Sequence, residues 1–396
     1  MSAVPTHSAR SDPASALRHL VLLFEDCPDF GADNDNKAHL LSDIIVIALC
    51  AVMGGANAWT AVERFGEGHE AWFRTFLTLE NGIPSHDTFQ RVFARLDPEV
   101  LNSRFGGWMA EIGGALTWKH IAVDGKTMRG SADNKGRLKG LHVVHAFATA
   151  NGVCLAQKVT AEKSNEITAI PELLKLLELK KSVVTIDAMG CPREIAAAIV
   201  DGQGDYLLAV KGNQEHLYED VQTTLAPMLG GEIILPEAEY ARTEETSRGR
   251  DEKRICYVST KVEHIRNQAL WKNLAAVGVV ISERVVNGKR EMETRYFISS
   301  RVLTAQEFLK AVRDHWRVEN QLHWVMDVVF GEDGHQLRKG SGPENFTLLR
   351  KLAHAMIKLG NPKHGIKGTR EMAGWNTDYL EKLICQVMES SGKCSA

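Results

Sequence analysis

Three acidic residues stand where a phosphodiester-processing enzyme would need metal ligands. Asp124 follows the apolar run 121–123, Asp187 follows the apolar run 183–186, and Glu319 lies inside a long amphipathic stretch. A carboxylate at the end of a buried strand is costly to desolvate unless a cation or hydrogen bonds compensate it. Mg²⁺ prefers such oxygen ligands, and two ions about 3.5–4 Å apart can activate a nucleophile and neutralise a leaving oxygen. The trio therefore predicts a site for two Mg²⁺ or Mn²⁺ ions.

Polar residues close to these acids are candidates for nucleic-acid contacts. Lys126 and Arg129 follow the first acid, and Lys211, Asn213 and Gln214 follow a later apolar run. Lys and Arg side chains hold phosphates, whereas Asn and Gln can donate to phosphates or read bases. All five residues are predicted to contact DNA.

A basic segment follows the third acid. Residues 336–370 contain eight Lys or Arg residues and one Glu. Such a segment could offset phosphate charge beside Glu319, and Arg338 and Lys339 are predicted DNA contacts for this reason. The alternative is a solvated helix face that binds no ligand.

Two histidines and two tryptophans surround the third acid. His315 and His323 lie four residues before and after Glu319, so a helix would place all three on one face. We predict DNA contacts for both histidines. A zinc site is the alternative, ranked lower because no cysteine lies near them. Trp316 and Trp324 are predicted to anchor the core, with stacking on an exposed base as the alternative.

The composition is that of an ordinary globular chain. Its 396 residues are 44% hydrophobic and 24% charged, with a formal net charge of −3, and the length predicts two or three structural units. The first residues lack the apolar core of a signal peptide, and the longest apolar run, 44–56, is short for a bilayer span. The seven cysteines show no paired spacing, which favours reduced thiols. We expect a cytoplasmic protein that does not enter membranes.

The positions of apolar residues divide the chain into regions. A β-β-β-α-β-α-β order predicts a mixed sheet with helices on its faces, and a strand-rich insertion separates it from the helix that carries Glu319. Within that insertion the charged stretch 242–254 has no periodicity and is predicted to be an exposed loop. The predicted regions are a disordered start (1–15), a helical N-terminal domain (16–115), the first part of the sheet domain (116–214), the β-rich insertion (215–303), the C-terminal helices of the sheet domain (304–385) and a flexible tail (386–396).

Four sequence blocks resemble the signature blocks of insertion-sequence DDE transposases of the H-repeat-associated type. They are IAVDGKTMRGS (121–131), VVTIDAMGCP (183–192), YLLAVKGNQ (206–214) and HWRVENQLHWVMDVVFGED (315–333). The similarity runs from about residue 22 to 380. It implies an RNase H-like catalytic domain, a helical N-terminal associated domain, and Mg²⁺-dependent cleavage and strand transfer at the ends of a mobile element. Asp124 and Asp187 match the first two acids of the family, and Glu319 matches the third.

The chain departs from the family pattern beside the last acid, and the implied function has two alternatives. Related transposases often carry Tyr, Arg and Lys around the last acid, where this chain has Val312, His315 and Met326. The implied function is a transposase that acts on double-stranded DNA as a homodimer. One alternative is a domesticated or decayed transposase that only binds DNA. Another, given little weight, is a hydrolase that uses two carboxylates without metal.

Overall fold

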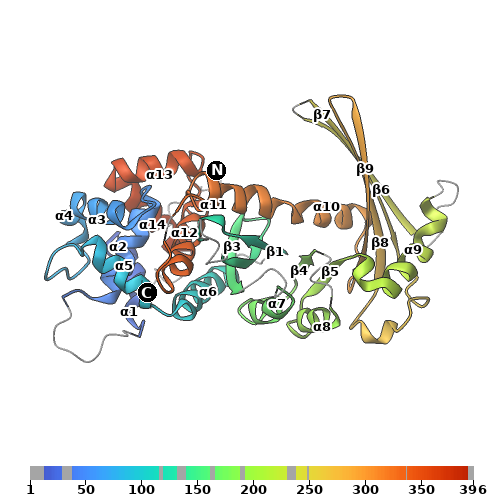
Figure 1. The fold of residues 1–396 in the computed structure, drawn as a ribbon, viewed down its shortest axis with the longest axis horizontal. Coiled ribbons are helices and arrows are strands. Elements are labelled where there is room, and N and C mark those ends of the chain that lie inside the picture. The colour runs from blue at the N-terminus through green and yellow to red at the C-terminus, as the bar shows by residue number, and fades with distance from the viewer. Residues whose placement is uncertain are drawn as a thin grey trace, which may run out of the picture.

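The computed structural model describes most of the chain, and the described residues are 13–28, 38–115, 119–131, 140–160, 166–187, 192–229, 238–247, 249–335 and 337–390. Residues 1–12 and 391–396, which were predicted to be disordered or flexible, lie outside these ranges. The rest forms helices at both ends of the chain around one long sheet (Figure 1). Within the described part, no helix is both long enough and apolar enough to cross a bilayer.

The helices of the N-terminal and C-terminal parts pack together at one end of the molecule, as Figure 1 shows by their blue and red colours. They are α1 (Pro13–Glu25), α2 (Leu41–Met53), α3 (Trp59–Gly68), α4 (Glu70–Phe73), α5 (His86–Arg95), α6 (Pro98–Ala115), α12 (Gly342–Leu359), α13 (Ile366–Trp375) and α14 (Thr377–Ser390). Every residue of α2 is buried, and α12 packs against both α2 and α5. The N-terminal helices therefore share one core with the C-terminal helices.

Two predicted boundaries are wrong at this end of the molecule. The tail was expected from residue 386, yet α14 continues to Ser390, and Val387 and Met388 are fully buried. The disordered start was expected to reach residue 15, yet α1 begins at Pro13. In both places apolar residues at helical spacing find a partner helix, since α1 packs against α14.

The central part of the sheet has the predicted strand order. The strands are β1 (His120–Thr127), β2 (His142–Ala148), β3 (Val153–Thr160), β4 (Val183–Ile186) and β5 (Asp205–Val210), arranged as β3-β2-β1-β4-β5. β1 and β2 pair antiparallel, as do β2 and β3, whereas β4 is parallel to β1 and to β5. Helices α7 (Glu166–Leu174) and α8 (Arg193–Asp201) lie on the face below the sheet in Figure 1, with α10 above it.

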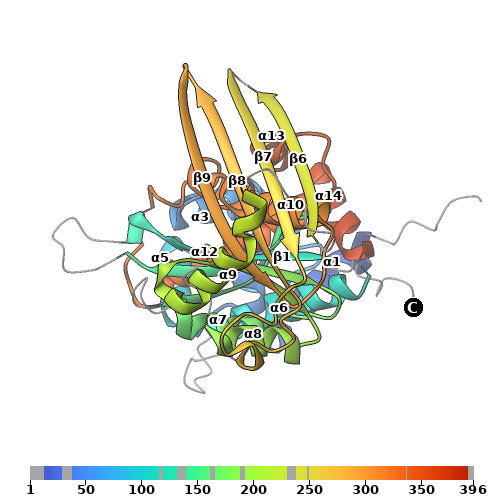
Figure 2. The same ribbon diagram turned by 90° about the vertical axis from the view of Figure 1, so that its right-hand side faces the viewer.

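The insertion extends the same sheet. After α9 (Glu215–Leu229) come β6 (Ala238–Ser247), β7 (Arg250–Ser259), β8 (Ala276–Val286) and β9 (Lys289–Ser299), and β9 pairs with β5 to give nine strands. Their far ends project from the body as tall hairpins (Figure 2). The predicted loop at 242–254 is wrong, because it forms the β6–β7 hairpin with Glu244 opposite Lys253. Both faces there are largely exposed, so no apolar alternation marks the strands.

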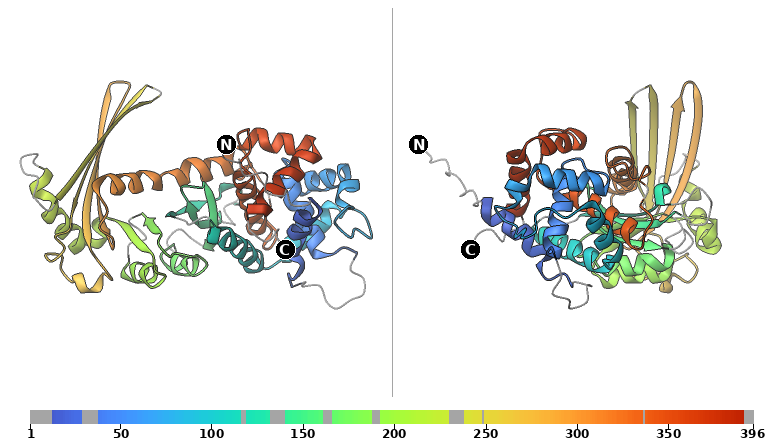
Figure 3. Two further views of the ribbon diagram at one scale, coloured as in Figure 1. Left: turned by 180° about the vertical axis from the view of Figure 1, so that it is seen from behind. Right: turned by 60° about the vertical axis from the view of Figure 1, so that its left-hand side comes forward.

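A long helical segment returns from the insertion to β1. It consists of α10 (Ala305–His315), the π-helical turn η6 (Glu319–His323) and α11 (Trp324–Val328). Thr304 and Glu307 form a capping box that starts α10. α10 contacts β6, β7, β4 and β1, so it spans from the projecting hairpins to the centre of the sheet (Figure 3). The predicted fold class is confirmed: an RNase H-like mixed sheet with flanking helices, N-terminal helices and a β-rich insertion before the helix of the third acid.

Candidate active site

The register of two parallel strands brings the first two acids together. Val123 of β1 pairs with Ile186 of β4, so the next residues, Asp124 and Asp187, lie at the same level of neighbouring strands. Neighbouring strands are about 4.8 Å apart. β1 continues alongside β2 to Thr127, whereas β4 ends at Ile186. The Asp124 side chain is consequently 25% exposed and the Asp187 side chain 59% exposed.

The third acid lies at the same pocket. Asp124, Asp187 and Glu319 all line one open cavity of about 180 Å³. Burial, followed by the charges of Glu319, Glu166 and Asp187, raises the pKa of Asp124 to about 7 against a hydrogen bond from the Gly125 backbone. Burial also raises the pKa of Glu319, while Arg295 lowers it. The three carboxylates therefore lie within electrostatic reach of one another, as the sequence predicted from separate elements.

The donor set fits a divalent cation of the Mg²⁺ or Mn²⁺ type. Three carboxylates from three elements face one pocket, and such oxygen ligands are those that these ions prefer. The high pKa of Asp124 reflects burial and like charge that a bound cation would compensate. No three His, Cys, Asp or Glu side chains of the described residues are close enough to enclose an ion. The carboxylates are thus neighbours without a closed ligand shell.

Several predicted DNA contacts are exposed, and one of them lies beside the carboxylates. Lys211 follows β5, its Nζ lies 3.7 Å from Asp187 Oδ1, and it lines the same pocket. Asn213 is exposed and Gln214 half-buried in the turn after Lys211. Arg129 is exposed after β1. Arg338 and Lys339 are exposed in the connection before α12.

Lys126 is not positioned as a DNA contact, which corrects the prediction. Its side chain is only 11% exposed, pairs with Asp327, and donates to Glu332 at 3.0 Å. Asp124 and Lys126 point to the same face of β1, but the helix bearing Glu319 covers Lys126 there. Sequence proximity to an acid could not show this, because both anionic partners come from more than 200 residues away.

Of the two histidines beside Glu319, His323 is largely buried, whereas His315 lines the carboxylate pocket. His315 Nδ1 lies 2.9 Å from Thr185 Oγ1, which also contacts His120 at 3.0 Å. His323 is 12% exposed, with Nδ1 3.8 Å from Asp124 Oδ2. Burial lowers the pKa of His315 to about 4 and that of His323 to about 3. His323 therefore has little exposed surface for the direct DNA contact predicted for it, whereas for His315, which lines the pocket, that contact stays a prediction.

Much of the predicted basic segment is interior. Arg350, Lys351 and Arg370 are at most 4% exposed. Lys351 donates to Gln157 Oε1 at 2.5 Å, and Arg370 donates to backbone carbonyls that include Val52 O at 3.0 Å. Lys351 and Arg370 thus join their helices to neighbouring segments, and the prediction of a phosphate-facing basic surface is wrong for all three buried cations.

Both tryptophans are exposed, contrary to the predicted role as core anchors. Trp324 is 56% exposed and Trp316 39% exposed. The guanidinium of Arg295 stacks 4.4 Å from the centre of the Trp316 ring, and both residues line the carboxylate pocket. Arg295 was not among the candidate site residues predicted from the sequence, because it lies in the insertion, far along the chain from the first two acids. It reaches the pocket because β9 pairs antiparallel with β5, the strand that Lys211 follows.

A second missed feature explains the glycine after Asp124. A Cβ on Gly125 would lie 2.2 Å from Glu166 Oε1 and 2.6 Å from His142 Nε2. These two side chains contact each other at 2.5 Å. Glycine at this position therefore lets the Glu166–His142 pair lie against the backbone of β1, where Glu166 contributes to the raised pKa of Asp124.

Comparison with known proteins gives one consistent family. Residues 118–356 match the model described as "Transposase DDE domain", and residues 23–109 match "DDE_Tnp_1-associated". The protein named "Putative transposase YncI" of Escherichia coli O157:H7 is 40% identical over 89% of this chain and 90% of its own length. The "H repeat-associated putative transposase YhhI" of Escherichia coli K12 is 38% identical over 87% and 92%.

One solved structure aligns along the chain. The cryo-EM structure of the piggyBac transposase synaptic complex with hairpin DNA covers 97% of this chain and 82% of that chain, with 9% identity and a TM-score of 0.44. The family assignment comes from the sequence matches, of which the DDE domain alone spans more than half of the chain. This protein belongs to the DDE transposase family.

Proposed function

We propose that this chain is an active transposase that cuts DNA at the ends of an insertion sequence and transfers the freed 3′ end to target DNA. The observation that supports this most is the convergence of three carboxylates on one pocket in a chain of the DDE transposase family. They come from two strand ends and a helix separated by the whole insertion. A fold that kept these acids only for stability would gain little from bringing like charges together.

Asp124, Asp187 and Glu319 would hold two Mg²⁺ or Mn²⁺ ions. When bound, such ions supply an activated nucleophile and neutralise the leaving oxygen of the phosphodiester. Asp124 would need to give up the proton that burial favours, and a nearby divalent charge lowers the pKa of a carboxyl. Asp187, more exposed than Asp124, lies where it can face the substrate backbone.

Exposed polar residues around the pocket would hold the DNA. Lys211 and Arg295 place two positive charges beside the carboxylates, and cationic side chains fix the register of a phosphate backbone. Arg129, Arg338 and Lys339 would contact phosphates further out. The substrate would be the double-stranded element end and then the target duplex, and joining two ends would require at least two copies of the chain.

The test is cleavage of DNA carrying the sequences that flank the coding region, with Mg²⁺ and with EDTA. Asp187→Asn removes one charge from a half-exposed side chain. We expect cleavage to fall by at least about a hundredfold, because metal ions contribute several kcal/mol of charge stabilisation. DNA binding by gel shift should stay within about twofold.

Asp201→Asn is the matched control, since Asp201 is an exposed carboxylate of α8 paired with Lys272 and is no part of the pocket. It should cut at the wild-type rate. Cleavage that persists in EDTA, or in Asp187→Asn, contradicts the metal assignment. DNA binding by the wild type without any cleavage supports the alternative of a transposase descendant that only binds DNA.

A further inference from the structure

One face of β1 presents more than the first acid. Asp124 and Lys126 are two residues apart on β1 and so point to the same face. His145 of β2 is paired with Asp124 in the register, which places it on that face as well. His145 is 1% exposed, and its Nδ1 lies 3.3 Å from His323 Nε2.

The helix that carries the third acid fits this face in register. Glu319, His323 and Asp327 follow one another at steps of four residues, on one side of the segment formed by η6 and α11. Glu319 lines the pocket, His323 Nδ1 lies 3.8 Å from Asp124, and Asp327 pairs with Lys126. The π-helical turn spans Glu319 to His323, and such turns are frequent at functional sites. The segment thus contacts the β1–β2 pair at two points beside Glu319, through His323 with Asp124 and His145 and through Asp327 with Lys126.

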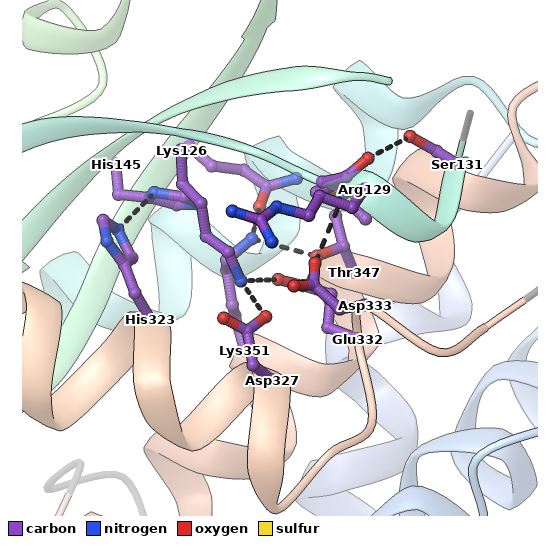
Figure 4. Close-up of polar contacts among 12 residues, drawn as sticks. Lys126, Arg129, Ser131, His145, His323, Asp327, Glu332, Asp333, Thr347 and Lys351 are labelled. Atoms are coloured by element: carbon purple, nitrogen blue, oxygen red, sulfur yellow. Dashed lines mark hydrogen bonds and ion pairs between the residues drawn. The ribbon is translucent and has the colours of Figure 1, made fainter. Parts of the chain in front are cut away.

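A chain of buried side chains continues from Lys126 into the protein. Figure 4 shows Lys126 between Asp327 and Glu332, with Thr347 and Lys351 next in line. Glu332 is 1% exposed and accepts a hydrogen bond from Thr347, which in turn accepts one from Lys351 at 3.0 Å. This chain of contacts links β1 to α12.

The loop after β1 packs against the same region through its backbone. A Cβ on Gly130 would lie 2.7–2.9 Å from the carbonyl oxygens of Asp333, His335 and Glu332. The Arg129 amide also donates to Asp333 Oδ1 at 3.3 Å. No side chain larger than glycine fits without displacing backbone, so residues 332–335 pack directly against the turn that follows β1.

We propose that Lys126 and His323 are positioning residues that clamp the helix of Glu319 onto the strand of Asp124, and so set the affinity of the first and third acids for divalent cations. This inference rests on the proposed function, because it assumes that these acids bind the ions. The rival explanation is that the same contacts only stabilise the fold. The rival predicts weaker folding with unchanged metal affinity in the folded protein.

The sign of one effect separates positioning from simple electrostatics. Lys126→Met removes a positive charge two residues from Asp124. If Lys126 acted on the cation only through its charge, its removal would tighten Mn²⁺ binding, whereas loss of positioning weakens it. Lys211→Met is the matched comparison, because Lys211 is exposed and lies 3.7 Å from the carboxylate of Asp187 on the open side. We expect Lys211→Met to bind Mn²⁺ as tightly as the wild type or more tightly.

The measurement is Mn²⁺ binding to the full chain without DNA. The electron paramagnetic resonance signal of free Mn²⁺ reports how much of the ion is bound. We expect Lys126→Met and Asp327→Asn to weaken binding about tenfold, as outer-shell substitutions commonly do. His323→Asn keeps a nitrogen near the Nδ1 position that faces Asp124, whereas His323→Gln keeps one near the Nε2 position that faces His145. We expect His323→Asn to retain more affinity than His323→Gln.

Urea unfolding of each variant identifies those that are folded under the binding conditions. If Lys126→Met does not fold, Asp327→Asn and the His323 pair carry the test, since Asp327 is 29% exposed and tolerates an amide. Wild-type affinity in folded Asp327→Asn and in both His323 variants overturns the clamp. If instead the wild type binds no Mn²⁺, or Asp187→Asn binds it equally well, the proposed metal site itself is wrong.

Discussion

Two carboxylates near β1, the half-buried Asp124 and the fully buried Glu332, behave in opposite ways. Asp124 has a pKa raised to about 7, because burial and three neighbouring acids oppose its charge. Burial alone would also raise the pKa of Glu332, but the charges of Lys351, Lys126 and Arg350 lower it to about 2. The difference lies in the partners and not in the depth of burial. A compensated acid holds the fold together, and an uncompensated one marks a place for a cation.

The largest expected effect concerns Glu332, the acid whose charge is compensated by buried cations. Glu332→Gln removes a fully buried anion and leaves Lys126 and Lys351 poorly paired. We expect the free energy of unfolding to fall by about 3–5 kcal/mol, measured with urea at pH 7. Glu99→Gln is the control, because Glu99 pairs with Lys158 at the surface and should change stability by less than about 1 kcal/mol.

The same acid predicts a pH dependence. Its pKa in the folded chain is below the ordinary value, so its stabilisation is present above about pH 4.5 and is lost as the pH falls toward about 2. Between pH 5 and pH 3 the wild type should therefore lose more stability than Glu332→Gln. Parallel pH profiles of the two proteins would show that other groups dominate acid unfolding.

A smaller change in stability, of opposite sign, is expected at Asp124, the acid whose charge is not compensated. Asp124→Asn removes a carboxylate whose raised pKa costs stability once the pH exceeds its ordinary value, and increasingly up to about pH 7. Without divalent cations at pH 8 we expect Asp124→Asn to be more stable than the wild type by roughly 2 kcal/mol. Adding Mn²⁺ should stabilise the wild type and not the variant. A destabilised Asp124→Asn would indicate that Asp124 has structural partners.

The smallest effect concerns the wall of the pocket. Trp316 is exposed beside the carboxylates, so stacking on an exposed base, the alternative to a core role, is open to test. We expect Trp316→Ala to weaken binding of DNA with unpaired bases at the element end by about 1–2 kcal/mol, in the range for base stacking. Trp375→Ala, 77% exposed on α13 at the helical end, should bind normally. Equal losses in both variants would contradict a specific role.

Local patterns were sufficient for the elements that carry the acids. The apolar runs before Asp124 and Asp187 predicted β1 and β4 with an acid at the end of each, and in the structure these strands form a parallel pair with both acids at the same end. The insertion was predicted to be strand-rich as well, and its β8 and β9 flank Asn287-Gly288, a residue pair typical of two-residue hairpin turns. In each case the signal lies within a few residues, because strand periodicity and turn chemistry are local properties.

The roles of the charged residues were decided by the tertiary structure. Lys126 and Lys351 look in the sequence like phosphate contacts, yet each is buried and bound to a partner from a distant segment. Arg295, by contrast, reaches the pocket only because β9 adds to the edge of β5. Whether a charge faces solvent or a buried counter-charge depends on long-range packing. The sequence alone thus determined which acids could meet, and the fold decided which cations surround them.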